Sequence, residues 1–367
     1  MNRNQLIQYS ANRYYQYHGA LERLVPELEA LGRRPLILMD ARVSELFGDR
    51  LQSILGRGGL EPPLGLVFEQ ECSQNACAQV AARGIAESAD SVVGVGGGKV
   101  CDAAKIIADK MGVRFILVPT SPATCAATAW LAVEYSDSGA FVGNYWSKLS
   151  AYATIVDLDI VYGNCPRRLL AAGMVDAMAK QPEISYNRKY SPLWHDNQFS
   201  RSASSLAKQI YDDLLMHGLS VYRAFGEQAA DQRADDVIAA CISLTGLVSA
   251  LACGGRQAAV SHSIYSYVCN TAPQIRNNYL HGEIVGASLI YQMALNGDSD
   301  KELNAFAAFL SALHMPKTLS DLGLHLDALQ RKELYGFLIE SLSLEAATTL
   351  PELQRFESLL FASESPH

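Results

Sequence analysis

The stretch from Ser91 to Lys105 constrains the fold most, because an apolar run there passes through glycines directly into a helical pattern. Gly96, Gly97 and Gly98 stand at the change from one pattern to the other. Glycines between a strand and a helix let backbone N–H groups approach a phosphate closely, and the helix N-terminus adds positive potential. The stretch therefore predicts a strand–turn–helix unit that binds a nucleotide pyrophosphate.

Short apolar runs alternate with helical patterns through the first half of the chain. The runs expected to be strands are 35–39, 64–68, 91–95, 115–118 and 154–157. The segments with helical spacing are 42–55, 73–87 and 100–111, and Ser73 is a suitable N-cap for the second of them. Residues 131–142 are expected to form a hairpin around a glycine-containing turn. This alternation predicts an α/β fold with a parallel sheet and helices on both faces.

Strand signals vanish after about residue 166, and helical patterns then dominate, with loops expected at 186–200 and 270–278. Gly163, Asn164 and Pro166 interrupt the pattern and favour a boundary at that point. A chain of 367 residues is also long enough for two domains. We therefore predict an α/β domain over residues 1–162 and an all-α domain over residues 163–367.

The charge and cysteine content exclude several kinds of partner. A net charge of −8 argues against nucleic acid and anionic membranes, because both attract basic surfaces. Eight cysteines without a CxxC pair argue against a zinc ribbon or a disulfide framework. The uncharged segment 237–255 is long enough to cross a membrane, but its polar residues favour a buried helix of the helical domain. We expect a cytoplasmic protein without a targeting segment.

Asp40 directly follows the first expected strand. Ligands of open α/β sheets bind at the carboxyl ends of the strands, where an acidic residue can bind the ribose diol of a dinucleotide. Asp40 precedes the glycines, whereas the acidic residue of the Rossmann fingerprint follows them by about 20 residues. The sequence leaves open whether Asp40 binds ribose or is an ordinary turn or helix-cap residue.

Three side chains of the second half are candidate metal ligands. Asp176 lies in the apolar helical run 169–178, where a carboxylate must be paired, hydrogen-bonded or bound to a metal. His262 and His281 also lie in apolar surroundings. One aspartate and two histidines suit a catalytic zinc with an open position. A buried histidine is nevertheless more often an ordinary core residue, and spacing alone does not unite the three.

Several motifs in a fixed order resemble the glycerol dehydrogenase branch of the metal-dependent, iron-containing alcohol dehydrogenases. The resemblance extends from about Asn12 to the last helices. The motifs are Gly94–Lys99 with Asp102 and 104–105, then 118–120 leading to Thr124, 131–135, 168–176, His262, and His281 to Glu283.

The resemblance implies that the first domain binds NAD, that the helical domain binds a divalent metal, and that the active site lies between them. The residues implied to bind the dinucleotide are Asp40, Gly96, Gly97, Gly98, Lys99, Asp102, Thr120, Leu131 and Tyr135. The implied metal ligands and catalytic residues are Asp176, His262 and His281, with zinc favoured over iron. The metal would polarise a substrate hydroxyl, and hydride would pass to the nicotinamide. Relatives self-associate, so a homo-oligomer is expected.

Three departures from the family pattern bear on the substrate. Cys125 stands where glycerol dehydrogenases carry a substrate-binding aspartate, and a thiol accepts hydrogen bonds from a diol far less strongly. This exchange favours a 2-hydroxy or 2-oxo acid over glycerol, unless Cys125 is merely a small buried residue. Pro182 interrupts a helical pattern after Asp176 and predicts a kink. Tyr265 and Ser266 replace a usual His-Asn pair.

The leading hypothesis is a metal-dependent NAD(H) oxidoreductase that interconverts a small alcohol, either a polyol or a 2-hydroxy acid, and its carbonyl form. One alternative is glycerol-1-phosphate dehydrogenase-like activity on the same scaffold. Another is a non-catalytic relative that binds nucleotide. Dehydroquinate synthase-like enzymes share the architecture but usually carry glutamate at the position of Asp176.

Overall fold

The computed structural model describes residues 11–192, 194–226, 232–252, 257–342, 344 and 350–361. Contacts between residues divide the chain into two compact units. The sheet unit contains the described residues up to Leu170 together with Phe225–Ala250, and the helical unit contains Ala171–Ala224 and the described residues from Leu251 onward. The first segment of the sheet unit therefore runs past residue 162, and a second segment joins it from the expected helical domain.

Within the described residues, the sheet unit holds one six-stranded sheet, and every pairing in it is parallel. Its order is β1-β8-β5-β4-β2-β3. The strands are β1 (Tyr14–Tyr17), β2 (Pro35–Met39), β3 (Leu64–Val67), β4 (Ser91–Gly96), β5 (Arg114–Pro119) and β8 (Ala153–Asp157). The five expected strands and their parallel arrangement are confirmed, whereas β1 was not expected.

Helices follow the strands. They are η1 (Ala20–Arg23), α1 (Leu24–Glu29), α2 (Ala41–Leu55), α3 (Gln74–Ala86), α4 (Gly98–Met111) and α5 (Leu158–Asn164). Of these, α2, α3 and α4 begin within two residues of the expected positions, whereas η1, α1 and α5 were not expected. The Ser73 hydroxyl accepts a hydrogen bond from the Ala76 N–H at 3.1 Å, which confirms the expected N-cap. The expected hairpin is also present as the antiparallel strands β6 (Leu131–Tyr135) and β7 (Phe141–Trp146).

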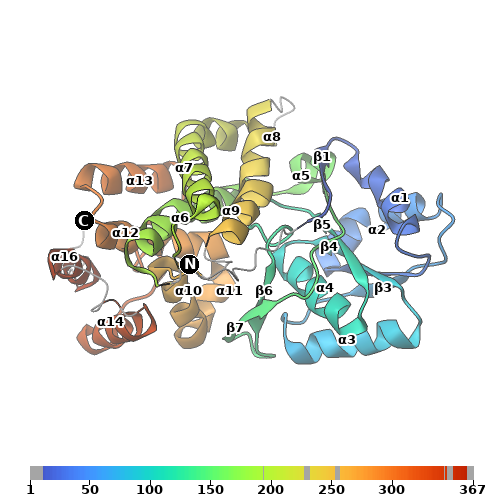
Figure 1. Ribbon diagram of the computed structural model, residues 1–367, viewed down its shortest axis with the longest axis horizontal. Coiled ribbons are helices and arrows are strands. Elements are labelled where there is room, and N and C mark those ends of the chain that lie inside the picture. The colour runs from blue at the N-terminus through green and yellow to red at the C-terminus, as the bar shows by residue number, and fades with distance from the viewer. Residues whose placement is uncertain are drawn as a thin grey trace. The chain divides into compact units, whose positions relative to one another are not determined.

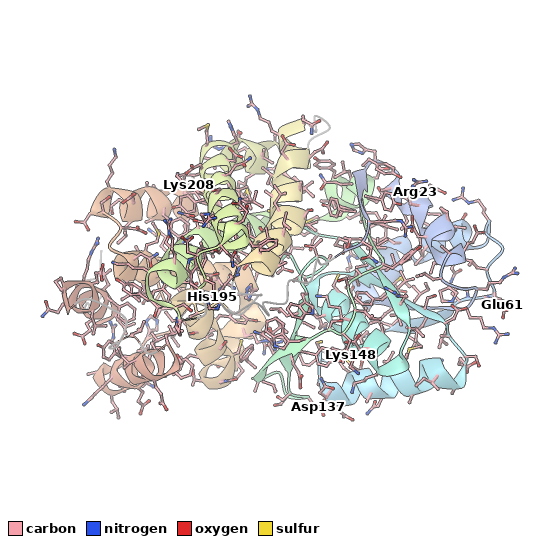
Figure 2. The ribbon with its side chains drawn as sticks, in the orientation of Figure 1. Arg23, Glu61, Asp137, Lys148, His195 and Lys208 are labelled. Atoms are coloured by element: carbon pink, nitrogen blue, oxygen red, sulfur yellow. The ribbon has the colours of Figure 1, made fainter. Side chains whose placement is uncertain are left out.

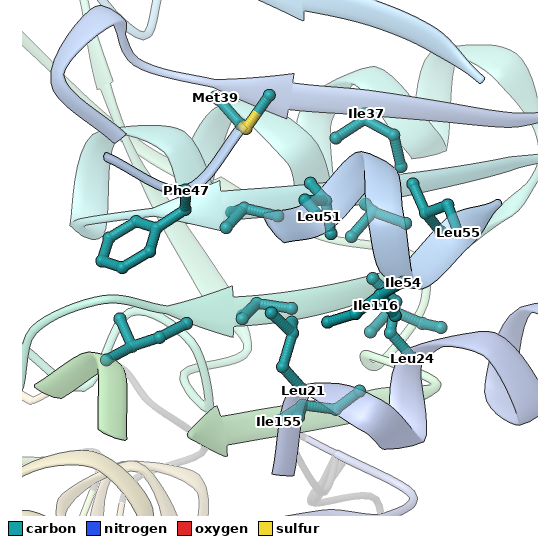
Figure 3. Packing of buried hydrophobic residues seen from close by; sticks show 14 of the residues in the cluster. Leu21, Leu24, Ile37, Met39, Phe47, Leu51, Ile54, Leu55, Ile116 and Ile155 are labelled. Carbon is teal, nitrogen blue, oxygen red and sulfur yellow. The ribbon is translucent and has the colours of Figure 1, made fainter. Parts of the chain in front are cut away.

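Helices cover both faces of the sheet. Successive residues of a strand point to opposite faces, so each strand places apolar side chains against helices on both sides. On one face, Ile37, Ile116 and Ile155 pack in a buried cluster with residues of η1, α1 and α2 (Figure 3). On the other face, a Cβ added to Gly94 would lie 2.8 Å from the Cβ of Ala104 on α4, so the strand and the helix are in close contact. Burial of these apolar side chains stabilises the unit by about 1.5–3 kcal/mol each.

Side chains of α4 attach the hairpin to the sheet unit. The fully buried Lys105 ammonium donates to Asp102 Oδ1 at 2.9 Å and to the Leu131 carbonyl at 2.7 Å. Asp102 Oδ2 accepts from the Val133 N–H at 3.0 Å. The carboxylate of Asp109, two turns beyond Asp102 on α4, accepts from the Lys148 N–H at 2.7 Å. A buried lysine is tolerated here because a carboxylate and a carbonyl compensate its lost hydration.

The described residues of the helical unit contain no strand (Figure 1). Its helices are α6 (Arg167–Tyr190), which begins in the sheet unit, and α7 (Gln198–Ala224), α10 (Val260–Thr271), α11 (Pro273–Asn278), α12 (His281–Asn296), α13 (Asp300–Ala312), α14 (Ala328–Leu342) and α16 (Leu350–Phe361). The expected loop at 270–278 is wrong, because Pro273 starts a short helix in its first turn, where proline is favoured. The loop expected from residue 186 begins only after Tyr190, and α6 is continuous through Pro182.

The helix Gln232–Leu251, made of α8 (Gln232–Ala239), η2 (Ala240–Leu244) and α9 (Thr245–Leu251), is the one described helix long and apolar enough to cross a membrane. A core helix passes the same test, and 61% of the tested segment is buried inside the protein. We expected it in the helical domain, but its contacts group it with the sheet unit. For example, Gln16 Nε2 donates to the Asp235 carbonyl at 2.7 Å. Residues 253–255 of the expected helix lie outside the described residues.

Charged side chains lie mainly on the outside of both units. Arg23, Glu61 and Lys208 extend from the ribbon into solvent (Figure 2), and all three are exposed. The acidic groups buried in the interior, such as Asp157 and Asp176, are therefore exceptions that need partners. Asp157 finds them in the backbone N–H groups of Gly19, Leu21 and Asp159.

Candidate functional site

The glycine turn of the sheet unit is shaped for an anion. β4 ends at Gly96, and Gly97 is the N-cap of the 14-residue helix α4. A Cβ added to Gly96 would lie 2.8 Å from the side chain of Val100, and one added to Gly98 would lie 3.0 Å from Thr124 Oγ1. A Cβ added to Gly97 would meet nothing within 4 Å. The turn is tightly packed at Gly96 and Gly98 and open at Gly97. This open space lies beside the first N–H groups of α4, where a pyrophosphate would fit.

The carboxyl edge of the sheet brings further expected residues near this turn. The Thr120 N–H donates to the Gly96 carbonyl at 3.1 Å and joins the ends of β5 and β4. Asp40 follows β2, whose last residue pairs with Val95 of β4. Lys99 is exposed and donates to the Glu69 carbonyl at 3.3 Å. The structure therefore places Asp40, the glycines, Lys99 and Thr120 along one edge.

Asp40 is a helix cap. Its Oδ1 accepts from the Val43 N–H at 2.8 Å at the start of α2. This satisfies one of the N–H groups that a helix start leaves without a partner. The cap function is compatible with a ribose contact, because a carboxylate has two oxygens and accepts several hydrogen bonds. The ribose role stays a prediction.

The remaining expected cofactor residues lie along α4 and the hairpin. Asp102 is almost fully buried in its pair with Lys105, so its observed role is to hold the hairpin. Leu131 and Tyr135 are the two ends of β6, and the Tyr135 N–H donates to the Cys72 carbonyl at 3.0 Å. Contacts of these three residues with a dinucleotide stay predictions.

Cys125 is partly exposed and begins a tight turn. Its carbonyl accepts from the N–H groups of Thr128 at 2.9 Å and Ala129 at 2.8 Å. The thiol is therefore not the small buried residue of the alternative interpretation. Its contact with a substrate stays a prediction.

The helical unit brings together the three expected metal ligands. Asp176 lies on α6, His262 on α10 and His281 at the first residue of α12. Asp176 Oδ1 lies 3.2 Å from His281 Nε2 and 3.6 Å from His262 Nε2, and all three ligand atoms lie within 4.8 Å of one another. Ligands about 2.0–2.2 Å from a tetrahedral zinc lie about 3.4 Å apart, so the cluster fits such an ion.

The motif from His281 to Glu283 explains how α12 delivers its ligand. Glu283 Oε2 accepts from the Leu280 N–H at 2.8 Å and caps the start of the helix. Gly282 packs so tightly on α6 that an added methyl group would collide with the carbonyl of Ala172. Since Ala172 lies one turn before Asp176, this contact holds His281 beside that carboxylate. The motif therefore combines a ligand, a close approach of two backbones and a cap.

Glu183 joins the site as a partner of His262. Its Oε1 contacts His262 Nδ1, and its Oε2 accepts from the Lys180 ammonium at 2.9 Å. Sequence reasoning did not select Glu183. It lies seven residues after Asp176 on one helix, hence on the same face, and this spacing of two acidic residues in an apolar run was the available signal.

The carboxylates of the cluster are held in their charged forms. Burial opposes ionisation of Asp176, but hydrogen bonds from His262 and His281 hold the pKa of Asp176 well below its usual range. Burial also opposes the charge of Glu183, but the charges of His262 and Lys180 lower its pKa to about 2. Burial lowers the pKa of His262, but the Glu183 and Asp176 carboxylates together raise it to about 9. The cluster therefore attracts positive charge, as a cation site requires.

The residues that depart from the family pattern pack against the ligands. The buried Tyr265 ring meets the His281 ring edge-on, with 4.3 Å between ring centroids. Ser266 Oγ donates to the His262 carbonyl at 3.0 Å. Both contacts support the positions of the imidazoles, because aromatic packing and a hydrogen bond each restrict motion of the ring or its backbone.

Comparisons with known proteins identify the family of the chain. The family model of iron-containing alcohol dehydrogenases matches residues 11–158. A glycerol dehydrogenase of Escherichia coli O6:H1 is 32% identical over 87% of this chain and 85% of its own length. Hydroxycarboxylate dehydrogenase A of Escherichia coli K12 is 31% identical over 72% of this chain and 71% of its own.

A solved structure confirms the fold. The crystal structure of a probable glycerol dehydrogenase from Sinorhizobium meliloti 1021 has a TM-score of 0.82 and 24% identity, and the match covers 98% of both chains. The sequence relatives give the family and the class of reaction. The chain belongs to the iron-containing alcohol dehydrogenases, in their glycerol dehydrogenase-like branch, and is a metal-dependent NAD(H) alcohol oxidoreductase.

Proposed function

We propose that this enzyme interconverts a small 2-hydroxy acid and the corresponding 2-oxo acid, with NAD(H) and zinc. The observation that carries the proposal is the balance of charge around Asp176, His262 and His281. Neutral imidazoles add no charge as ligands, and Lys180 neutralises Glu183 across 2.9 Å. A divalent cation with one ligand carboxylate keeps a net positive charge, which suits an anionic substrate.

Cys125 supports the same substrate class. The aspartate that the family resemblance implies at this position would cancel the remaining positive charge and accept hydrogen bonds from a diol. A neutral thiol does neither, so a substrate that brings its own carboxylate is favoured. The relative named hydroxycarboxylate dehydrogenase A is consistent with this choice.

Zinc is the metal proposed because the donor set has two nitrogens and one oxygen and leaves room for a further ligand. Two histidines and one carboxylate also serve iron(II) in other enzymes, so iron is the alternative. When bound, the metal supplies Lewis-acid polarisation of the substrate oxygen. Measurement of the metal bound to the purified protein, followed by removal and separate reloading with zinc and iron(II), tests this choice.

The chain's own residues supply orientation. Gly97 leaves room for the pyrophosphate at the start of α4, and Asp40 supplies a carboxylate at the neighbouring strand end. That negative charge disfavours the additional phosphate of NADP, so the proposal specifies NAD. Hydride transfer requires that one substrate molecule binds the metal while its carbinol carbon lies next to the nicotinamide.

Glycerol and other polyols form the second candidate substrate class, because the chain is 32% identical to a glycerol dehydrogenase. Steady-state kcat/KM values with lactate and with glycerol, measured in the same buffer with NAD, distinguish the two classes. The proposal expects lactate to be preferred. A preference for glycerol would overturn the 2-hydroxy acid assignment and leave the family assignment intact.

A substitution at Cys125 tests the physical reason. We expect Cys125→Asp to move the ratio of kcat/KM values about 10-fold or more toward glycerol, since it restores a charged acceptor worth about 1.5–3 kcal/mol. Cys125→Ser, which has similar size and no charge, is the matched control and leaves the ratio nearly unchanged. An unchanged ratio in Cys125→Asp would contradict the proposed contact with substrate.

We also propose that the enzyme works in a reducing cytoplasm and self-associates. None of the described cysteines is in a disulfide, and burial raises the pKa of the Cys101 and Cys165 thiols to about 12, which favours their unreactive protonated form. Light scattering coupled to gel filtration measures the mass of the particle. A mass equal to that of one chain would contradict self-association.

A further inference from the structure

We propose that Glu183 is a positioning residue that fixes the tautomer of His262, so that the imidazole Nε2 presents its lone pair to the metal. This inference depends on the metal centre of the helical unit and is independent of the substrate proposed above. It assigns a function to a buried acidic group that binds neither metal nor cofactor itself.

The contacts of Glu183 determine which ring nitrogen carries hydrogen. Glu183 is 1% exposed, and its ionised carboxylate only accepts hydrogen bonds. Its Oε1 contacts His262 Nδ1, so Nδ1 must be the protonated nitrogen. The imidazole that binds a metal has lost one ring proton and keeps a single N–H group, so the other nitrogen then presents its lone pair. That nitrogen is Nε2, which lies 3.6 Å from Asp176 Oδ1.

The opposite tautomer is unfavourable for two reasons. With hydrogen on Nε2, the lone pair of Nδ1 would face the Glu183 carboxylate. Two hydrogen-bond acceptors, Nδ1 and Oε1, would then lie in contact without a hydrogen between them, which is costly for the buried Glu183. The nitrogen directed at Asp176 would also lack the lone pair that a metal needs. Second-layer carboxylates that accept from a ligand histidine have this orienting effect in metal sites generally.

Glu183 has two further contacts, of which the ion pair with Lys180 holds it in place. Ser261 Oγ donates to Oε1 at 3.1 Å, and the Lys180 ammonium donates to Oε2 at 2.9 Å. Lys180 lies one turn before Glu183 on α6 and is mostly buried. Its positive charge favours the ionised carboxylate, which is the form that accepts from His262.

Buried amides fix the backbone on which His262 is carried. Asn187 Nδ2 donates to the Ala258 carbonyl at 2.7 Å, and the Ala258 N–H donates back to Asn187 Oδ1 at 2.9 Å. The Val260 N–H donates to Gln292 Oε1 at 2.7 Å. Asn187 and Gln292 are completely buried. They lie on α6 and α12, so the two helices that carry Asp176 and His281 also hold the segment entering α10.

The experiment compares three variants of the full-length protein. Glu183→Gln keeps the shape of the side chain and removes its charge. Glu183→Asp keeps the charge that Lys180 requires but shortens the reach toward His262. Ser261→Ala is the matched control, because it removes a hydrogen bond to the same Oε1 and leaves the imidazole contact intact.

The probe is Zn²⁺ alone, and its dissociation constant is measured by competition with a chromogenic chelator. We expect Glu183→Gln and Glu183→Asp to raise this constant about 10- to 100-fold and Ser261→Ala to change it about threefold or less. The affinity for NAD stays unchanged in all three variants. Thermal unfolding of each metal-free variant shows whether it is folded, and Glu183→Asp carries the test if Glu183→Gln is unfolded.

A second measurement reports on the tautomer itself, which a merely structural role would not affect. In the zinc-loaded protein with ¹⁵N-labelled histidine, NMR should show His262 protonated at Nδ1 and bound through Nε2. The Nδ1–H resonance should shift strongly in Glu183→Gln and remain in place in Ser261→Ala. Binding through Nδ1 in the native protein would overturn the proposal, as would unchanged zinc affinity in both folded Glu183 variants.

The two proposals fail separately. A protein that binds zinc with the expected tautomer but does not turn over 2-hydroxy acids contradicts the substrate proposal alone. A native protein that turns over 2-hydroxy acids but whose zinc affinity is insensitive to both Glu183 substitutions contradicts the positioning role alone.

Discussion

The proposed dinucleotide site of the sheet unit and the proposed metal centre of the helical unit are built in opposite ways. The first consists largely of backbone, in a turn of three consecutive glycines between β4 and α4. The second consists of side chains from α6, α10 and α12, and Asp176 and His262 lie far apart in the sequence. A local site survives changes in distant packing, whereas a dispersed site depends on every contact between its helices.

The same contrast appears in what each site needs around it. The glycine turn needs only a strand before it and a helix after it, because backbone N–H groups would bind the expected anion. The metal centre needs a cap at Glu283, a close backbone approach at Gly282 and a carboxylate at Glu183. Substitutions that affect one site and spare the other measure how independent the two constructions are.

The largest effect is expected from His281→Ala. Loss of one of three ligands should abolish zinc retention and lower turnover about 10³-fold or more, because the Lewis acid contributes several kcal/mol. Zinc content is measured by atomic emission and NAD affinity by fluorescence titration. NAD affinity should remain that of the native enzyme. Wild-type turnover in the variant would refute the ligand assignment, and parallel loss of NAD binding would refute the independence of the two sites.

Acidic conditions should weaken the metal centre next most strongly. The pKa of His262 is raised to about 9 in the metal-free protein, so below that pH zinc must displace a proton from the ring. The apparent zinc affinity should therefore fall about tenfold for each pH unit between about 9 and 6. Chelator competition at several pH values measures the slope. NAD affinity over the same range is the control, and a flat zinc profile would contradict the protonated ring.

Gly97→Ala should weaken NAD binding and spare zinc binding, the reverse of the effect expected for His281→Ala. The fold has room for the methyl group above Gly97, but that room is where the pyrophosphate is expected. We expect NAD affinity to fall about tenfold or more, equivalent to about 1.4 kcal/mol, with zinc retention unchanged. Gly96→Ala is a different case, because its methyl would collide with Val100 and lower stability. Unchanged NAD affinity in a folded Gly97→Ala protein would contradict the pyrophosphate site.

The smallest effect is expected at Asp40, where two roles can be separated. Asp40→Asn keeps an N-cap oxygen for the Val43 N–H but removes the charge, so it should lower the preference for NAD over NADP by a few fold and leave the melting temperature unchanged. Asp40→Ala should alter the preference similarly and also cost about 1 kcal/mol of stability. Cofactor titration and thermal unfolding measure the two effects. An unchanged cofactor ratio in both variants would leave Asp40 as a cap only.

The five strands and three helices expected in the sheet unit were predictable from the sequence to within two residues of their observed starts. The strand Pro35–Met39 and the cap at Ser73 follow from a short apolar run and a polar residue before a helix. β1 was missed because Tyr14–Tyr17 is an edge strand without alternating or continuous apolar residues. The return of Phe225–Ala250 to the sheet unit could not be predicted, since helical spacing does not say which partner a buried face meets.

The candidate site shows the same limit. Asp176, His262 and His281 were identified individually, but only the family resemblance united them, because their convergence is a product of helix packing. Glu183 was missed for a related reason. Its importance lies in its contact with His262 Nδ1, and the sequence does not show which atom a side chain faces in the fold.

The sheet unit closes only when a late part of the chain returns to it. Tyr162 contacts Asp235, and Thr128 contacts the Ile242 carbonyl, so the helix Gln232–Leu251 completes a unit whose sheet ends at Asp157. During synthesis, α6 and α7 leave the ribosome before that closing helix does. The two units are therefore interleaved along the chain, and a fragment that stops after the last strand lacks one helix of the sheet unit.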